Sequence, residues 1–282
     1  MRHAILHRLG RVPQIAGMAM RKLSGGLRCL PDTIIIGAQK SGTSSLFSYL
    51  TQHPEIRGSS RKEVHYFDGG LVPGVDNYRK GENWYRAHFP LDTGERDKRL
   101  IEATPSYLFV PSVPGRIQQL LPEAKLIVVL RDPVERAISH FFHEVRGGKE
   151  SRPIMPALTE EDDLLAPIWK SGDFKSRQFL SFSYKARGRY AEQVSRYFEL
   201  FSREQVLVLS SKALFEATND TLAGIFEFLG VGGSLQTTID QRPKNVGTNK
   251  SPVEASVRDY LSDYFAPHNE TLFELLGERL DW

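Results

Sequence analysis

The sequence predicts an α/β protein in which a parallel β-sheet is flanked by helices. Short apolar segments rich in β-branched residues alternate along the chain with longer segments of helical character. One short segment, residues 126–130, is apolar at every position, which is typical of a central parallel strand covered on both faces. Two of the short segments end in a loop that leads straight into a helix. Ligands of such folds bind at the carboxyl ends of the strands, so we expect the functional residues there.

The predicted elements follow this alternation through the chain. We expect strands near residues 33–36, 99–103, 125–130 and 205–210. We expect helices near residues 43–52, 76–88, 112–121, 133–146, 189–201, 219–229, 253–265 and 267–277. The stretch 147–188 contains three scattered prolines and is the least regular. In an α/β enzyme such an insertion often serves as a lid or as a wall for the substrate.

The first strand and helix enclose a candidate anion site. Ile34, Ile35 and Ile36 form a short buried strand, and Gly37 and Gly42 allow a tight loop after it. Hydroxyl residues then open the helix. The unpaired N–H groups and the positive dipole end of such a helix attract phosphate or sulfate. A plain glycine turn is the alternative, but it does not call for Lys40 and several hydroxyls in so few residues.

The position of the lysine separates this loop from that of nucleoside triphosphatases. Their pattern G-x-x-x-x-G-K-[ST] places a lysine directly after the second glycine. Gly37 and Gly42 have that separation, but Thr43 occupies the lysine position and Lys40 precedes Gly42 instead. The loop therefore suits an anion but lacks the lysine that a magnesium–triphosphate site requires.

A second segment, residues 126–142, follows the same plan of strand, loop and helix. Arg131 lies at the end of the apolar strand, and Pro133 suits the first turn of a helix. The planar fork of an arginine binds phosphate in bidentate fashion and keeps its charge. Ser139 is eight residues further on, so convergence with Arg131 requires the helix to fold back over the strand tip. The alternative is that Arg131 only pairs with Asp132.

These motifs resemble those of sulfotransferases that use 3′-phosphoadenosine 5′-phosphosulfate (PAPS). The loop Gly37-x-x-Lys40-Ser41-Gly42-Thr43 resembles their 5′-phosphosulfate loop, a P-loop-like element. Arg131 and Ser139 match the family's pair for the 3′-phosphate. The segments 62–67 and 101–107 resemble elements of the glycan branch, which includes heparan sulfate sulfotransferases. The tail 264–282 resembles bacterial members, and the resemblance covers residues 31–282. Ala103 departs from the pattern, because the family has a basic residue there.

The resemblance implies a set of site residues. The donor-binding residues are Gln39, Lys40, Ser41, Gly42, Thr43, Ser44, Ser45, Arg131, Ser139 and Lys250. The acceptor-binding residues are Lys62, Glu102 and Tyr107, and the catalytic residues are Lys40, Glu63 and His65. Lys40 would stabilise the leaving phosphate and Glu63 would take the acceptor proton. His65 is a rival base or a ligand for the sulfuryl oxygens, because an extended segment would point it to the same side as Glu63.

Some of these assignments have plain alternatives. Lys62 and Glu63 could form no more than an exposed ion pair. The basic loop 242–252, which contains Lys250, could either fold over the nucleotide, as in family members, or be an exposed turn. The eight histidines form no known metal-binding pattern, so we expect PAPS as co-substrate and no metal.

The implied reaction is transfer of a sulfuryl group from PAPS to a hydroxyl or amine of a carbohydrate or glycolipid. A small alcohol or phenol is the alternative acceptor. A kinase-like P-loop enzyme is a less favoured reading, because the triphosphatase lysine is missing. A nucleotide-binding module without catalysis is disfavoured, because Glu63, His65 and Glu102 are all present.

Composition and charge place one enzyme domain at 32–282 behind a basic arm at 1–31. The arm carries six basic and no acidic residues, whereas the remainder carries 31 basic and 34 acidic residues. That balance argues against a general nucleic-acid binder. Apolar residues recur in the arm at helical spacing, which fits a helix lying on an anionic membrane; a helix packed on the domain and a flexible leader are the alternatives. The single cysteine, Cys29, permits no internal disulfide. Without an apolar run long enough to span a membrane, we expect a cytoplasmic enzyme, either free or peripheral at the membrane surface, of undetermined oligomeric state.

Overall fold

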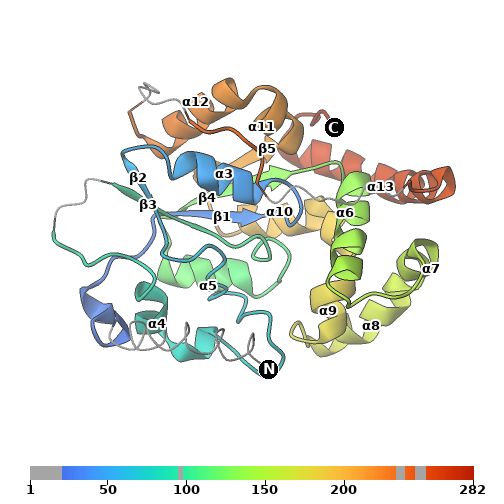
Figure 1. Cartoon of the computed structure of the whole chain (residues 1–282), viewed down its shortest axis with the longest axis horizontal. Coiled ribbons are helices and arrows are strands. Elements are labelled where there is room, and N and C mark those ends of the chain that lie inside the picture. The colour runs from blue at the N-terminus through green and yellow to red at the C-terminus, as the bar shows by residue number, and fades with distance from the viewer. Residues whose placement is uncertain (1–20, 95–97, 233–238, 245–251) are drawn as a thin grey trace, which may run out of the picture.

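The computed structural model describes residues 21–94, 98–232, 239–244 and 252–282. Its core is a five-stranded sheet in the order β2-β3-β1-β4-β5, and every neighbouring pair is parallel (Figure 1). The strands are β1 (Thr33–Gly37), β2 (Ile56–Gly58), β3 (Arg99–Ala103), β4 (Lys125–Leu130) and β5 (Val206–Ser210). The predicted α/β class with a parallel sheet is therefore confirmed.

Helices cover both faces of the sheet (Figure 1). The helices between the strands are α3 (Thr43–Leu50), α4 (Glu82–Arg86), α5 (Val113–Leu120), α6 (Pro133–Arg146), α7 (Ile154–Thr159), α8 (Glu161–Ser171), α9 (Arg177–Phe182) and α10 (Tyr190–Phe198). After β5 come α11 (Ser211–Glu216), α12 (Thr218–Leu229) and α13 (Ala255–Leu276). Short 3₁₀ turns are η1 (Gly25–Leu27), η2 (Tyr78–Lys80), η3 (Ala186–Gly188) and η4 (Arg203–Gln205).

Alternation along the strands divides the core into two layers. Ile34 and Ile36 of β1 pack with side chains of α5 and α10 on one face. Ile35 points the other way and packs with α3, α11 and α12. Successive side chains of a strand point to opposite faces, so a continuous isoleucine run serves both layers at once. The strands β1 and β4 are neighbours in the interior of the sheet. At its carboxyl end β1 leads into α3, and β4 leads into α6.

Several element boundaries differ from the predicted ones. The short edge strand β2 and helix α11 were not predicted. The predicted helix at 76–88 is divided into η2 and α4 by Gly81, whose φ is +80°. Two helices predicted near the C-terminus are one continuous helix, α13, which accommodates Pro267 in its interior. The irregular stretch 147–188 contains α7, α8 and α9, because its apolar residues pack against α6.

The part of the basic arm that the structure describes packs on the enzyme body. Arg28 donates through Nη1 to the Phe89 carbonyl at 2.8 Å, and the Cys29 N–H donates to the Pro90 carbonyl at 3.0 Å. Arg28 and Cys29, which the sequence analysis assigned to the arm, therefore contact the enzyme body. Residues 1–20, which carry most of the predicted amphipathic stripe, lie outside the described residues. In the described part of the chain, no helix combines the length and apolar character needed to cross a membrane.

Candidate active site

A large cavity of about 1620 Å³ opens at the carboxyl ends of β1 and β4. Side chains from many elements line it, from the loop after β1 to the last residue, Trp282. The predicted site residues on its wall are Gln39, Lys40, Gly42, Thr43, Ser44, Glu63, His65, Arg131 and Ser139. The fold thus gathers three separate sequence motifs around one space.

The loop between β1 and α3 has the geometry of an anion cradle. Gly42 precedes α3 with φ of +97°, a conformation that side chains disfavour, and a Cβ there would also lie 3.0 Å from the Phe215 ring. At Gly37 a Cβ would lie 2.5 Å from that of Leu108. Thr43 and Ser44 of the first turn face the cavity. Backbone donors and hydroxyls at the start of α3 therefore line the same wall.

Ser41 and Ser45 do not line the cavity, in contrast to the expectation that they bind the donor. Both side chains are fully buried beneath the loop. The Ser45 hydroxyl accepts the backbone N–H of Lys244 at 2.9 Å, and Lys244 does line the cavity. Ser45 therefore holds the start of the 242–252 loop against α3. Lys250 itself lies outside the described residues.

Positive charge is concentrated around the loop. Burial first, and then the neighbouring Arg146, Arg131 and Arg136, lower the pKa of Lys40. The Arg131 guanidinium donates to the Lys40 carbonyl at 3.3 Å, which ties the strand-end arginine to the loop. Repulsion among cations is relieved when an anion binds between them. The cradle is therefore electrostatically suited to an anionic ligand.

Arg131 and Ser139 both face the cavity, as the hypothesis of convergence requires. Helix α6 begins directly after β4, and the Asp132 carboxylate caps it by accepting the N–H groups of Val134 and Glu135. The Arg131 carbonyl accepts the Tyr190 hydroxyl at 2.9 Å, which fixes the strand end. Arg131 lies 3.9 Å from Glu135, so its pairing partner is Glu135 and not Asp132.

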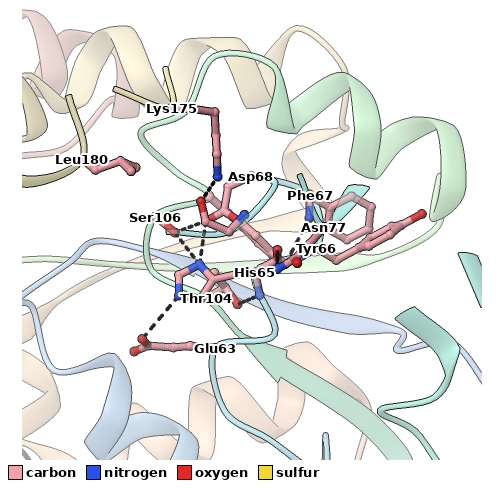
Figure 2. Close-up of polar contacts among 12 residues, drawn as sticks. Glu63, His65, Tyr66, Phe67, Asp68, Asn77, Thr104, Ser106, Lys175 and Leu180 are labelled. Carbon is pink, nitrogen blue, oxygen red and sulfur yellow. Dashed lines mark hydrogen bonds and ion pairs between the residues drawn. The ribbon is translucent and has the colours of Figure 1, made fainter. Parts of the chain in front are cut away.

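Glu63, His65 and Asp68 form a chain of charges beside the cavity, with Glu63 and His65 on its wall and Asp68 buried behind His65 (Figure 2). The His65 Nδ1 atom lies 2.7 Å from the Asp68 carboxylate, and Nε2 lies 3.7 Å from that of Glu63. Glu63 and His65 have φ of +60° and +55°, so the segment is not extended as expected, yet both side chains still converge. Ser106 donates to Asp68 at 2.5 Å and completes the cluster.

The two carboxylates keep the imidazole charged. Burial alone would lower the pKa of His65, but hydrogen bonds to Asp68 and Glu63 outweigh it and raise that pKa to about 9. The hydrogen bond to His65 lowers the pKa of Glu63 to about 2, and the Lys62 ammonium at 2.6 Å adds to this. At neutral pH His65 is therefore an imidazolium without a lone pair, whereas Glu63 is an ionised carboxylate.

The structure predicts that Asp68→Asn lowers the pKa of His65 substantially. Nuclear magnetic resonance titration of the imidazole measures it, with Asp76→Asn as a control outside the cluster. Because the folded pKa lies above the usual 6.5, the imidazolium stabilises the fold fully below about pH 6.5, and this contribution is lost as the pH rises through about 9. The loss in free energy of unfolding caused by Asp68→Asn, measured by urea unfolding, should therefore be larger at about pH 6.5 than above about pH 9. An unchanged His65 pKa in the variant would refute the assigned pairing.

Glu102 and Tyr107 lie in the core and do not reach the cavity, which corrects the expectation that they bind the acceptor. The Glu102 carboxylate is fully buried and accepts hydroxyls from Tyr85, Thr104 and Tyr107. The Tyr107 hydroxyl in turn accepts the N–H of Tyr66 at 2.9 Å. These contacts anchor the loop that carries Glu63, His65 and Asp68.

Thr104 extends this anchor to His65, because its hydroxyl accepts the His65 N–H at 3.4 Å (Figure 2). Burial raises the pKa of Glu102 despite the three hydroxyl donors. Lys62 is also absent from the cavity wall and pairs with Glu63, but the pair is partly buried and Glu63 lines the cavity, so it differs from the exposed ion pair of the plain alternative. The role of Glu102 is therefore to position the loop.

Asp68 and Ser106 are site residues that the sequence reasoning missed. Asp68 stands three residues after His65 and before Gly69-Gly70, and its other oxygen accepts the Gly70 N–H at 2.9 Å. An aspartate just before two glycines is typical of a turn. The sequence therefore gives Asp68 a structural explanation and no indication that it contacts His65. The wall of the cavity also includes Arg146, Arg177 and Arg187, for which the sequence offers no motif.

The fold and site together define an α/β enzyme whose anion loop lies beside a charged carboxylate–histidine cluster. A profile of the family described as "Sulfotransferase domain" matches residues 30–254, and the chain belongs to that family. The resemblance and the enzyme class expected from the sequence are therefore confirmed. In the described residues, no group of acidic, histidine or cysteine side chains is arranged to hold a metal.

Curated relatives are similar over most of this chain. The membrane-associated sulfotransferase kil1 of Dictyostelium discoideum is 27% identical over 92% of this chain and 68% of its own length. Human heparan sulfate glucosamine 3-O-sulfotransferase 3A1 is 28% identical over 92% of this chain. The chain spans 64% of that relative and only 30% of mouse heparan sulfate N-deacetylase/N-sulfotransferase 4, which is 28% identical.

Solved structures support the fold. A sulfotransferase from Alicyclobacillus acidocaldarius matches with a TM-score of 0.72 and 30% identity, covering 89% of this chain and 98% of that one. The sulfotransferase domain of the Synechococcus PCC 7002 olefin synthase shares the fold with a TM-score of 0.52 and 17% identity, over 90% of this chain and 97% of that one.

Proposed function

We propose that the protein transfers a sulfuryl group from PAPS to a hydroxyl or amine of a carbohydrate or glycolipid. The observation that carries this proposal is that the anion loop and the pair Glu63 and His65, which Asp68 supports from behind, line the same cavity. PAPS supplies the sulfuryl group, and 3′,5′-adenosine diphosphate leaves as the acceptor oxygen or nitrogen bonds to sulfur. The heparan sulfate relatives support a glycan acceptor. A small alcohol or phenol remains the alternative.

The residues of the loop fit this donor. Lys40, Thr43 and Ser44 face the space at the start of α3, and Arg131 and Ser139 face it from β4 and α6. The buried Gln39 side-chain oxygen has no hydrogen-bond partner in the described residues. It can therefore accept a hydrogen bond from an amine or hydroxyl of a bound ligand. Lys40 would neutralise charge on the leaving phosphate oxygen, and Arg131 with Ser139 would hold the 3′-phosphate.

The charge states favour Glu63 as the base. Imidazolium His65 has no lone pair to accept a proton, whereas ionised Glu63 does. The low pKa of Glu63 limits its basicity while Lys62 and His65 stabilise the anion. An acceptor hydroxyl that displaces Lys62 removes one of these partners and brings the pKa of Glu63 upward. His65, held by Asp68, orients Glu63 and stabilises charge beside it.

Incubation with ³⁵S-labelled PAPS tests the donor and the acceptor class. We expect label to pass to carbohydrate or glycolipid of a cell extract in the presence of a metal chelator. Labelled small phenols would establish the alternative acceptor. Label transfer from [γ-³²P]ATP with magnesium, and none from PAPS, would instead support a kinase-like enzyme and overturn the proposal.

We also propose that the basic arm brings the enzyme to anionic lipid. Each basic residue near such a surface contributes on the order of 1 kcal/mol, which salt screens. Because Arg28 and Cys29 pack on the body, the test uses a chain that starts at Arg21. It should lose binding to vesicles of phosphatidylserine and phosphatidylcholine that the full chain binds at low salt, while both chains keep activity on a water-soluble acceptor. Full-length protein that ignores such vesicles would contradict the proposal.

A further inference from the structure

The turn at residues 71–75 exposes apolar side chains at the edge of the cavity. Leu71, Val72 and Val75 are 49%, 60% and 41% exposed. A single exposed apolar residue is ordinary, but several within one short turn mark a contact site. Leu71 and Pro73 line the cavity, whereas Val72 and Val75 do not. The apolar surface therefore continues from the cavity wall over its rim to the outside of the molecule.

The turn has a fixed conformation. The Val75 N–H donates to the Val72 carbonyl at 3.1 Å, which closes a four-residue β-turn. Pro73 and Gly74 occupy its centre, and Gly74 has φ of +75°, as the third residue of a type II turn does. The proline ring fixes the φ of the second residue. The turn therefore loses little conformational entropy when a ligand packs on it.

The chain segments on either side of the turn are held together at its base. The Asn77 N–H donates to the Gly69 carbonyl at 2.9 Å. A Cβ at Gly69 would lie 2.6 Å from the Asp76 carboxylate, and one at Gly70 would lie 2.8 Å from the Asn77 amide nitrogen. The two glycines thus allow the segments to pack closely. The Lys175 ammonium also donates to the Gly70 carbonyl (Figure 2).

The base of the turn is bonded to the residues beside the proposed reaction centre. The Gly70 N–H donates to the Asp68 carboxylate at 2.9 Å, and the other oxygen of that carboxylate holds His65. The Asn77 side chain donates to the His65 carbonyl at 2.9 Å (Figure 2). Glu63 and His65 line the cavity. The turn therefore keeps a fixed position relative to the pair at which the acceptor is proposed to react.

The surroundings of the turn indicate an amphiphilic ligand. Inside the cavity, Leu180 of α9 adds apolar surface, whereas Glu63 and His65 are charged. A ligand that covers both the charged pair and the outer face of the turn needs a polar end and an apolar end, and it extends past the rim. A small alcohol or phenol beside Glu63 would leave Val72 and Val75 uncovered, because these side chains lie outside the cavity.

We propose that the turn at residues 71–75 binds the alkyl part of an amphiphilic acceptor, so that the enzyme selects a lipid-linked carbohydrate over a free one. The carbohydrate end lies beside Glu63, and the alkyl chain leaves the cavity across Leu71 and Val72. Burial of apolar surface on both partners provides the affinity. This inference rests on the proposed function for the carbohydrate, whereas the alkyl site itself is defined by the exposed turn.

Calorimetry with octyl and methyl β-glucoside tests the alkyl site. The two ligands share the sugar and differ only in chain length, and octyl glucoside is used below the concentration at which it forms micelles. Burial of roughly two or three methylene groups should make the octyl compound bind wild type about 10- to 100-fold more tightly than the methyl compound. The double variant Leu71→Ser, Val72→Ser should lose most of this preference and bind methyl glucoside as wild type does.

Leu200→Ser is the matched control, because Leu200 is 45% exposed and does not line the cavity. It should keep the full preference for the octyl compound. Equal binding of both glucosides by wild type, or no binding of octyl glucoside, overturns the proposal. Equal loss of both glucosides in the double variant would mean that the turn shapes the sugar site, which contradicts it. If wild type shows no octyl preference and the double variant loses binding to phosphatidylcholine vesicles, the turn contacts a bilayer and the proposal is wrong.

A labelling experiment separates this inference from the proposed function. A cell extract is incubated with ³⁵S-labelled PAPS, and the products are passed over a reversed-phase resin, which retains molecules with an alkyl chain. We expect retained label with wild type and Leu200→Ser, and about 10-fold less with the double variant. Label found only in the unretained fraction would agree with the proposed transfer but overturn the alkyl site. Absence of any label would refute the proposed transfer, while the glucoside titration, which needs no nucleotide, would still decide the alkyl site.

Discussion

Replacing Glu63 by glutamine is expected to lower turnover about 100- to 10,000-fold while the affinity for 3′,5′-adenosine diphosphate is unchanged. Glutamine keeps the shape of the side chain but cannot accept the acceptor proton. Glu63 lies on the cavity wall, whereas the nucleotide contacts come from the anion loop and Arg131. Rates with PAPS and an identified acceptor, together with calorimetry on the nucleotide, separate the two effects.

Two further variants make the Glu63 test decisive. Glu199→Gln changes an exposed carboxylate at the end of α10, and we expect it to be as active as wild type. His65→Ala removes the imidazolium, and we expect a smaller loss of turnover, because Glu63 then remains as base without its orienting partner. Near-normal turnover in Glu63→Gln with an inactive His65→Ala protein would transfer the role of base to His65.

Replacing Arg131 by alanine is expected to weaken binding of 3′,5′-adenosine diphosphate about 10- to 100-fold. The variant loses a charged fork that faces the cavity and also the contact with the Lys40 carbonyl. Calorimetry in the presence of a metal chelator measures the affinity, because the proposed binding needs no magnesium.

The control for Arg131 is Arg79→Ala, since Arg79 is a largely exposed arginine that does not line the cavity. It should bind the nucleotide as wild type does. Adenosine 5′-monophosphate, which lacks the 3′-phosphate, should bind with similar affinity to wild type and Arg131→Ala. Wild-type affinity for the diphosphate in Arg131→Ala would remove the assigned 3′-phosphate role.

The local parts of the site were predictable because short-range physics specifies them. A β-branched run followed by glycines predicts a strand and a loop. Lys40 lies between Gly37 and Gly42, so its position at the strand end follows from residues that are neighbours in the chain. The same reasoning placed Arg131 at a strand end, because an apolar run must stop where a charge begins. The structure has both residues on the cavity wall.

The side chains whose location the sequence did not predict are those whose environment is formed by distant segments of the chain. Glu102 belongs to a predicted strand and to a family motif. The sequence alone does not tell whether its carboxylate faces the cavity or the core. The structure buries it, because Tyr85, Thr104 and Tyr107 bring three hydroxyls to it from separate elements. A buried carboxylate needs such donors, and their convergence is a tertiary property.

By itself, the sequence determined the α/β class, the anion loop and the order of the family motifs, since each depends on residues that are neighbours in the chain. Only the tertiary structure decided that Asp68 pairs with His65, which makes the imidazole a cation at neutral pH. Only the tertiary structure placed Arg187 in the cavity with two nitrogens unpartnered in the described chain. The physical reason is that charge state and hydrogen-bond satisfaction depend on distance in space and on burial, and distant segments set both when they pack together.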